Sequence, residues 1–284
     1  MTRSRRRAPS GFVREWFLTE SPFDALEIES RAWTAGLGFV QPVYERPGLR
    51  LSLGLRGELR ESRTFLLGEP FSFSPGVNDG KARLSILRFT QDALWRDEVQ
   101  VLAARSMLSF GLPILGATAS HDGLPGGEFF SWLLQTQYAR RLPFAGLEFV
   151  ARLDAQTPRD PLLSIEQFSM GGWSSVRGYR INQIVRDGAL VGSLELRIPV
   201  MARADGSPLV QLAPFFDNGY AWNVSLPQFG PPWIGSVGLA LRVFVLPGIM
   251  AELSWGGRLQ HIPQPAHRTI EDYGFSVRVG ALLF

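Results

Sequence analysis

The stretch that most constrains the fold of this chain is Gly171-Gly172-Trp173-Ser174-Ser175-Val176-Arg177-Gly178-Tyr179-Arg180. It places Arg177 directly before a glycine and an aromatic residue, Gly178 and Tyr179, in a long polar segment. Two later segments, residues 192–197 and 215–219, alternate apolar and polar residues and carry Glu195 and Asp217. A loop arginine followed by acids on two neighbouring strands suggests a loop that folds back into the lumen of a β-barrel, where a guanidinium can pair with a carboxylate.

Strict alternation extends outward from this region along most of the chain. In residues 49–60, Leu51 and Leu53 fall on one face, and Arg50 and Arg56 fall on the other. A period of two with one wholly apolar face indicates a strand that lies between two different solvents. The same pattern recurs in residues 147–156, 190–198, 237–245 and 249–256.

About eleven strands are predicted, and their connections alternate between short and long. The strands are expected near residues 27–40, 49–60, 81–91, 99–110, 129–141, 146–157, 189–199, 209–218, 234–245, 249–257 and 274–284. Short turns at one end and long loops at the other are typical of bacterial outer-membrane barrels. The predicted fold class is therefore all-β, an antiparallel meander of a transmembrane β-barrel. The alternative is a soluble β-sandwich whose apolar faces form a core.

The composition is consistent with this class. The chain has 284 residues, which suffice for one large all-β domain, and Gly 30 and Pro 20 suit a turn-rich protein. It has no cysteine, which excludes disulfides and thiolate metal sites. No apolar run approaches the roughly 20 residues of a membrane helix. The basic residues alternate with apolar ones along strands, so no nucleic-acid partner is expected.

The N-terminal segment, residues 1–21, is predicted to be a basic stub. Its arginines at positions 3 and 5–7 are followed by no apolar core, so it is not a signal peptide. The remainder, residues 22–284, is predicted to be the barrel, with an inward-folded loop near residues 166–188. Because an outer-membrane protein needs a signal peptide, we expect the chain to be the C-terminal part of a longer product.

Three motifs and one preceding run resemble a known family. The residues that carry the resemblance are Val176-Arg177-Gly178-Tyr179, Gly192-x-x-Glu195-x-Arg197, Phe215-x-Asp217-x-Gly219 and the run 161–172. In these residues the chain is similar to the barrel of two-partner secretion transporters of the haemolysin-activator (TpsB) class, ShlB/FhaC/HecB-like, within the superfamily of outer-membrane assembly and translocation barrels.

The resemblance implies a loop motif, Val176 to Tyr179, that reaches inner-wall partners on two strands. The implied partners are Asp217, Glu195, Arg197, Phe215 and Gly219. It also implies a sixteen-stranded barrel, a plug helix and two periplasmic POTRA domains. With about eleven strands and no room for POTRA domains, this chain departs from that pattern. An open sheet with an unpaired edge near residues 27–40 is therefore expected.

The function expected from the resemblance is translocation of a secreted haemolysin- or adhesin-like protein across the bacterial outer membrane. The expected partners are that exoprotein, the barrel-assembly machinery and outer-membrane lipid. The C-terminal Phe284 is predicted to be the signal that the assembly machinery reads. Two alternatives stay open: an insertase of the same superfamily that assembles other barrels, and a passive porin-like channel.

The sequence offers little for catalysis. His121, His261 and His267 all fall in predicted loops, and no nucleophile, zinc or phosphate-binding motif is present. No enzyme activity, cofactor or metal is expected.

Overall fold

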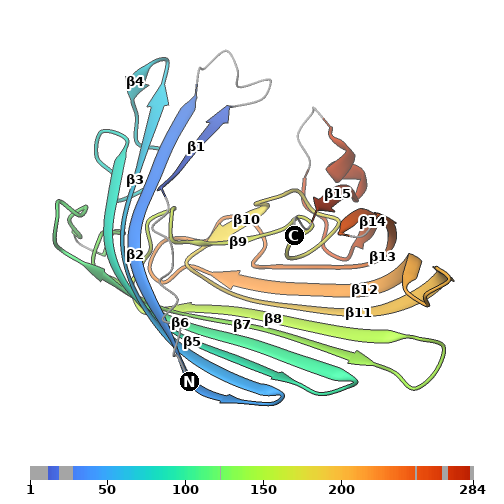
Figure 1. The fold of residues 1–284 in the computed structure, drawn as a ribbon. Helices are drawn as coiled ribbons and strands as arrows, with labels where there is room; N and C mark the ends of the chain where they lie inside the picture. The colour runs from blue at the N-terminus through green and yellow to red at the C-terminus, as the bar shows by residue number, and fades with distance from the viewer. Residues whose placement is uncertain (1–11, 19–27, 122, 247, 264–267, 282–284) are drawn as a thin grey trace.

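The computed structural model describes residues 12–18, 28–121, 123–246, 248–263 and 268–281 (Figure 1). One antiparallel sheet dominates it. Its strands are β1 (Phe12–Leu18), β2 (Glu29–Arg46), β3 (Leu49–Leu66), β4 (Glu69–Pro70), β5 (Lys81–Arg96), β6 (Gln100–Leu112), β7 (Phe129–Arg141), β8 (Glu148–Pro158), β11 (Gly188–Ala202), β12 (Pro208–Trp222), β13 (Trp233–Leu246), β14 (Ile249–Arg258) and β15 (Phe275–Ala281).

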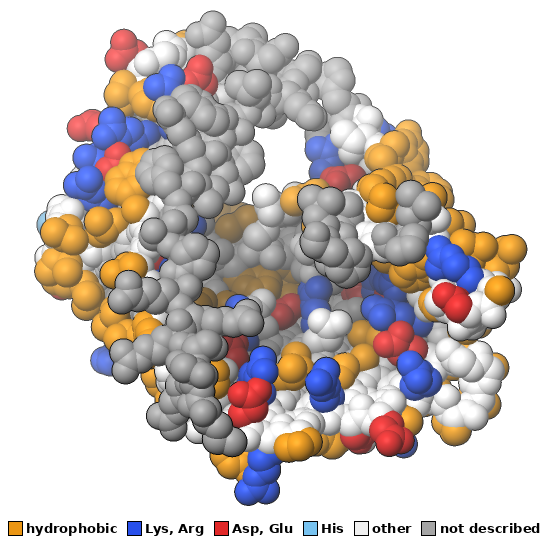
Figure 2. All heavy atoms as spheres, viewed as in Figure 1, with side chains coloured by type: hydrophobic (Ala, Val, Ile, Leu, Met, Phe, Trp, Pro, Cys, Tyr) orange, Lys and Arg blue, Asp and Glu red, His pale blue; other side chains and the backbone are white. Residues whose placement is uncertain are grey.

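The sheet is a meander in which each long strand pairs with its neighbours along the chain. The order is β1-β2-β3-β5-β6-β7-β8-β11-β12-β13-β14-β15, and the short β4 pairs with β3. Figure 1 shows the sheet curving strongly, and the space-filling view in Figure 2 shows the hollow on its concave side. Within the described residues β1 and β15 do not pair, so the sheet is open, as predicted. No helix in the described part of the chain is long and apolar enough to cross a membrane.

All eleven predicted strands are present, and several run further than predicted. The strand expected over residues 49–60 continues to Leu66, and that expected over 81–91 continues to Arg96. Their additional residues, 61–66 and 92–96, mix charged, polar and apolar side chains and present no wholly apolar face, so the alternation did not mark them as strand. Backbone pairing does not depend on side-chain polarity, so the ladder continues wherever the neighbouring strand is long enough. The connections still alternate between short and long.

The edge of the sheet differs from the prediction. Residues 29–35 of β2, part of the edge expected near residues 27–40 to be unpaired, pair with β1. The strand β1 lies within residues 1–21, for which no strand was predicted. Charged residues in that segment exclude the apolar core of a signal peptide, but they are compatible with a strand. Residues 36–46 of β2 have a paired neighbour only in β3 among the described residues.

The two faces of the sheet divide as the alternation predicts. Leu53, Leu194 and Leu239 lie on the convex outer face and are substantially exposed. Glu195 and Asp217, on the opposite face, are buried. Apolar side chains therefore point outward and not into a core between two sheets, which excludes the sandwich alternative. The outer face is the one that a membrane would cover.

The connection between β8 and β11 turns back inside the curved sheet. It contains a small hairpin of β9 (Phe168–Met170) and β10 (Ile184–Arg186), which lies within the hollow in Figure 1. Two buried apolar clusters fix it to the wall. One contains Met170, Val176, Tyr179, Ile184, Ala189, Val191, Ala221, Ile234 and Ile262. The other contains Ala82, Leu84, Ile86, Phe129, Leu162 and Leu163.

Candidate functional site: an arginine lock inside the sheet

The site is built around Arg177, at the inner end of the folded-back loop. Its Nε donates to Asp217 Oδ2 over 2.8 Å and its Nη2 to Oδ1 over 2.9 Å. Its Nη1 donates to Glu195 Oε2 over 2.7 Å, and Nη2 reaches Ser193 Oγ at 3.3 Å. We call the contacts among Arg177, Asp217, Glu195 and Ser193 the arginine lock. The planar guanidinium suits this arrangement because its donors form a rigid fork.

Neighbouring strands position the acids of the lock. Ser193 on β11 lies directly opposite Asp217 on β12, and its hydroxyl donates to Asp217 Oδ1 over 2.6 Å. Glu195 is two residues further along β11, on the same face, and pairs across the sheet with Phe215. The period of two therefore aims both carboxylates inward. Asp217 is fully buried, so its charge requires the partners that it has.

A wider set of charges balances the lock. Glu195 also accepts hydrogen bonds from Arg242 on β13, at 2.7 and 3.0 Å, and from Arg197 Nε at 2.9 Å. Arg242 in turn bonds Glu252 on β14. Four strands thus contribute to one alternating network of cations and anions. Isolated buried charges are costly, but here each has an opposite charge at hydrogen-bond distance.

Close packing brings the loop backbone to the wall. The guanidinium carbon of Arg177 lies 3.5 Å from the ring centroid of Phe215, so the ring face covers the cation. At Gly178, where φ is +89°, a Cβ atom would stand 2.5 Å from the carbonyl oxygen of Gly256 on β14. At Gly219 a Cβ atom would stand 2.1 Å from the Met170 sulfur. Glycine at these places lets the loop touch the strands.

The residues beside the lock hold the loop to its neighbours. The Tyr179 hydroxyl lies 2.9 Å from the carbonyl oxygens of Gly235 and Gln260, which share its one proton as acceptors. Arg180 pairs with Asp272 in the 3-10 helix η2 (Ile270–Tyr273), with Nε to Oδ1 at 2.6 Å. This hydrogen bond lowers the pKa of Asp272 to about 2. The loop is therefore also tied to the connection that follows β14.

A second ionic anchor lies at the start of the loop. Arg88 on β5 donates from Nη2 to both oxygens of Glu166, at 2.8 and 3.0 Å, and from Nε to Glu58 at 3.0 Å. Arg60 on β3 also pairs with Glu166. The loop is thus fixed to the β3–β5 wall by an acid and to the β11–β12 wall by an arginine.

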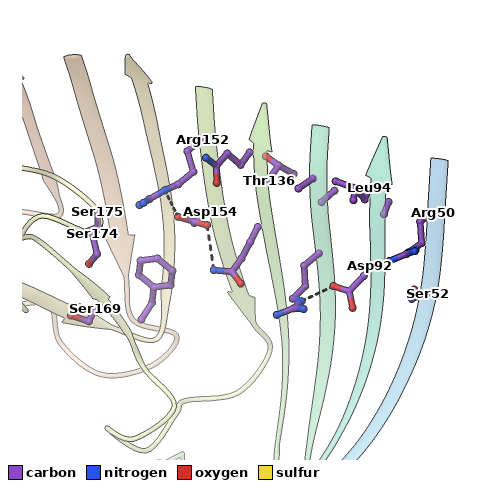
Figure 3. A pocket seen from close by; sticks show the side chains of 17 residues that line it. Arg50, Ser52, Asp92, Leu94, Thr136, Arg152, Asp154, Ser169, Ser174 and Ser175 are labelled. Atoms are coloured by element: carbon purple, nitrogen blue, oxygen red, sulfur yellow. Dashed lines mark hydrogen bonds and ion pairs between the residues drawn. The ribbon is translucent and has the colours of Figure 1, made fainter. Parts of the chain in front are cut away.

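A polar cavity of about 700 Å³ lies beside the docked loop. Figure 3 shows Ser174 and Ser175 of the loop on one side, and Asp92, Arg152 and Asp154 on the strands opposite. Its wall charges are paired, with Arg152 Nε 2.9 Å from Asp154 Oδ2. The docked loop therefore leaves part of the hollow open to polar solutes.

The structure brings together most of the residues that the sequence predicted for this site. Val176 packs in the first apolar cluster beside Gly219. Arg197 contacts Glu195 and Glu148 and makes no hydrogen bond to Arg177 among the described contacts. Phe284 lies outside the described residues. Within the described part of the chain, no group of three or more histidines and carboxylates could hold a metal ion.

Sequence reasoning missed Arg242, Glu166 and Ser193. Arg242 and Ser193 carry a signal, because each is on the inward face of an alternating strand. Glu166 lies within the run 161–172 that supported the resemblance, but its partners, Arg60 and Arg88, lie far away in the sequence. No local pattern identifies that contact.

Fold and site together define a class of protein: a membrane β-barrel wall with a loop locked into its lumen. The chain belongs to the family described as haemolysin secretion/activation protein ShlB/FhaC/HecB, whose model matches residues 26–242. The family's proteins lie in the outer membrane of Gram-negative bacteria, and this chain is an outer-membrane protein. The sequence has no significant match among curated proteins.

Several solved structures share the fold. CdiB from Escherichia coli is 18% identical, with a TM-score of 0.69 over 95% of this chain and 49% of that one. CdiB from Acinetobacter baumannii is 15% identical, with a TM-score of 0.66 over 86% of this chain and 42% of that one. BamA from Haemophilus ducreyi lacking POTRA domains 1–3 is 14% identical, with a TM-score of 0.59, over 95% of this chain and 57% of that one. The chain spans about half the length of these relatives.

Proposed function

We propose that this chain forms the wall of an outer-membrane pore through which a secreted haemolysin- or adhesin-like protein passes. The single observation that carries the proposal is the buried arginine lock, which holds an extracellular loop inside the pore. The membership of the haemolysin secretion/activation family supports secretion as the process. The polar cavity beside the loop supports a solvated path for an extended polypeptide.

In this proposal the lock selects one loop conformation, and secretion requires it. Removing one partner of a buried ion pair typically costs about 3–5 kcal/mol, because the remaining charge is left unpaired. Without Arg177, both Asp217 and Glu195 would lose a partner in a buried site. The docked loop would then be replaced by a range of conformations that obstruct the pore.

The proposal assigns no catalytic step to the chain. Its function would be passage and gating, with no nucleotide and no cofactor. The insertase alternative has in its favour the likeness to BamA, which is a likeness of fold. A passive channel would not require a loop that several ionic contacts hold in the lumen. We therefore favour secretion over both.

The test compares two arginine substitutions in the full-length protein. Arg177→Ala should reduce export of the cognate secreted partner about tenfold or more, while the outer-membrane level of the transporter stays the same. Arg140→Ala is the matched control: this arginine is exposed on β7 and does not line the cavity, so its loss should change little. Equal export by the two variants would contradict the proposal. Export and membrane level are both measured by immunoblot.

A further inference from the structure

A row of cations crosses the outer face of the sheet at the end that carries the long connections. Arg31 on β2 lies opposite Arg63 on β3, and Arg63 lies opposite Lys81 on β5. All three point outward, because Arg60 and Arg88, on the alternate positions, pair with the loop inside. Figure 2 shows several Lys and Arg side chains at the upper left, interspersed with Asp and Glu side chains.

The row is not neutralised by its own neighbours. Like charges directly opposite each other in a sheet repel. One buried carboxylate, Glu61, serves Arg63 at 2.7 Å, Arg83 at 3.1 Å and Lys81 at 3.9 Å. Arg31 pairs with Glu29 at 2.9 Å. Among the ion pairs of the described residues, Arg63, Arg83 and Lys81 share the single carboxylate of Glu61, which leaves an excess of two positive charges, and an anion there would offset the repulsion.

An apolar groove of about 360 Å³ lies further along the same three strands, toward their short turns. Its floor is Gly57, where a Cβ atom would meet nothing within 4 Å. Leu37 and Leu87, the cross-strand partners of Gly57, form two sides. The groove is on the outer face, so it opens toward the membrane.

The connection after β6 folds over the upper end of this groove. Its polar backbone groups are used against β5: Thr118 N donates to Arg83 O at 2.9 Å, and Ser85 Oγ donates to Ile114 O at 2.8 Å. Near the groove it exposes the apolar side chains of Ile114 and Leu115. A turn with satisfied backbone groups and outward apolar side chains is suited to a lipid environment.

Along the strands, the cation row and then the apolar groove follow each other in the same order as the charged headgroup and the acyl chain of a lipid. Long loops of outer-membrane barrels are extracellular, so the cation row lies at the outer interface and the groove lies within the outer leaflet. A lipid of that leaflet would present its phosphate at the row and an acyl chain at the groove. Guanidinium groups bind phosphate with charge-assisted hydrogen bonds, and an apolar groove gains from covering hydrocarbon.

We propose that the outer face of β2, β3 and β5 is a binding site for a phosphate-bearing lipid of the outer leaflet, with Arg63 and Lys81 at the phosphate and the Gly57 groove at an acyl chain. The site is on the opposite face of the sheet from the arginine lock. It needs only the outer-membrane location and does not depend on the proposed secretion function.

The test uses the detergent-solubilised full-length protein and lipid A, a phosphorylated acyl disaccharide, as the probe. Bound lipid is counted by native mass spectrometry, in parallel with the dephosphorylated form. We expect the dephosphorylated lipid to bind about tenfold more weakly, as for the loss of one charge-assisted contact. The double variant Arg63→Gln/Lys81→Gln should lose about the same factor for the phosphorylated lipid only. Raising the salt concentration should weaken the wild-type contact.

Two further variants separate the site from its surroundings. Gly57→Trp fills the groove without a backbone clash and should weaken both lipids. Arg140→Gln removes an exposed cation at the C-terminal end of β7, far from the cation row, and should change the binding of neither lipid. Equal binding of both lipids to the wild type, or unchanged binding to the double variant, would overturn the proposal. Displacement of the lipid by an acidic peptide at equal concentration would also overturn it, by assigning the row to a protein partner.

Discussion

The ion pair of Glu166 with Arg88 carries its charges the opposite way round from the ion pair of Arg177 with Asp217. In the first pair the acid is on the loop and the arginine is on the wall; in the second the arginine is on the loop and the acid is on the wall. The loop therefore spans the hollow between two ionic anchors of opposite sign. Because the anchors are on different walls, each should contribute separately to keeping the loop docked, and each can be tested alone.

The first prediction concerns the anchor at Glu166. Glu166→Gln should raise the hydrogen-exchange rates of the amides of residues 162–166 about tenfold, because two arginines lose a charged acceptor. Glu148→Gln is the control, since this acid makes a partly exposed pair with Arg197. Unchanged exchange in Glu166→Gln would show that the apolar packing of Leu162 and Leu163 suffices to hold this part of the loop.

The second prediction is a charge exchange at the lock. Arg177→Asp combined with Asp217→Arg should restore only a small part of the export that Arg177→Ala loses. An aspartate at position 177 would face Glu195, whose carboxylate now accepts from the arginine. Adding Glu195→Gln to the exchanged pair removes that repulsion and should improve export, as measured by immunoblot of the secreted partner. Full restoration by the exchange alone would mean that Glu195 has no part in the lock.

The third prediction concerns Gly178. Gly178→Ala should undock the loop, because its Cβ atom would collide with the Gly256 carbonyl. Gly206→Ala is the matched control: its φ of +80° carries the same strain of about 1 kcal/mol, but nothing lies within 4 Å of the added atom. Tryptic cleavage after Arg180 in the folded protein should accelerate in the first variant only. Similar cleavage in both would show that backbone strain alone decides docking.

The fourth prediction concerns pH and the contact between Arg180 and Asp272. The pKa of Asp272 in the folded state, about 2, lies below the ordinary value of 3.8, so its charged carboxylate stabilises the docked state above about pH 4. That contribution is lost as the pH falls through 2. A spin label at Ile181→Cys should therefore stay immobile from pH 7 to pH 4 and become mobile only near pH 2. Asp272→Asn should make it mobile at every pH.

The matching control for the pH series is Asp97→Asn. Asp97 lies in an exposed turn, and its carboxylate accepts a hydrogen bond from Gln100. It should leave the spectrum of the label unchanged. Mobility that increases between pH 6 and pH 4 would contradict the assignment, because no group with a lowered pKa at this contact loses its charge there.

The sequence by itself determined the strands and their two faces. Alternation needs no knowledge of the partner strand: the period of two sends Glu195 and Asp217 to one face and Leu194 and Phe216 to the other, whatever surrounds them. For the same reason the eleven strands could be predicted, while their ends could not. A strand end such as residues 61–66 has no wholly apolar face to mark it.

Only the tertiary structure decided which charges meet. Arg88 and Glu166 are 78 positions apart, and Arg177 and Asp217 are 40 apart. Their contacts depend on the curvature of the sheet and on the path of the loop through the hollow, neither of which a local pattern encodes. The cation row of Arg31, Arg63 and Lys81 has the same origin. Strand register places these three residues side by side, and the register of each strand pair depends on its turn and bulges, which the alternation within one strand does not fix.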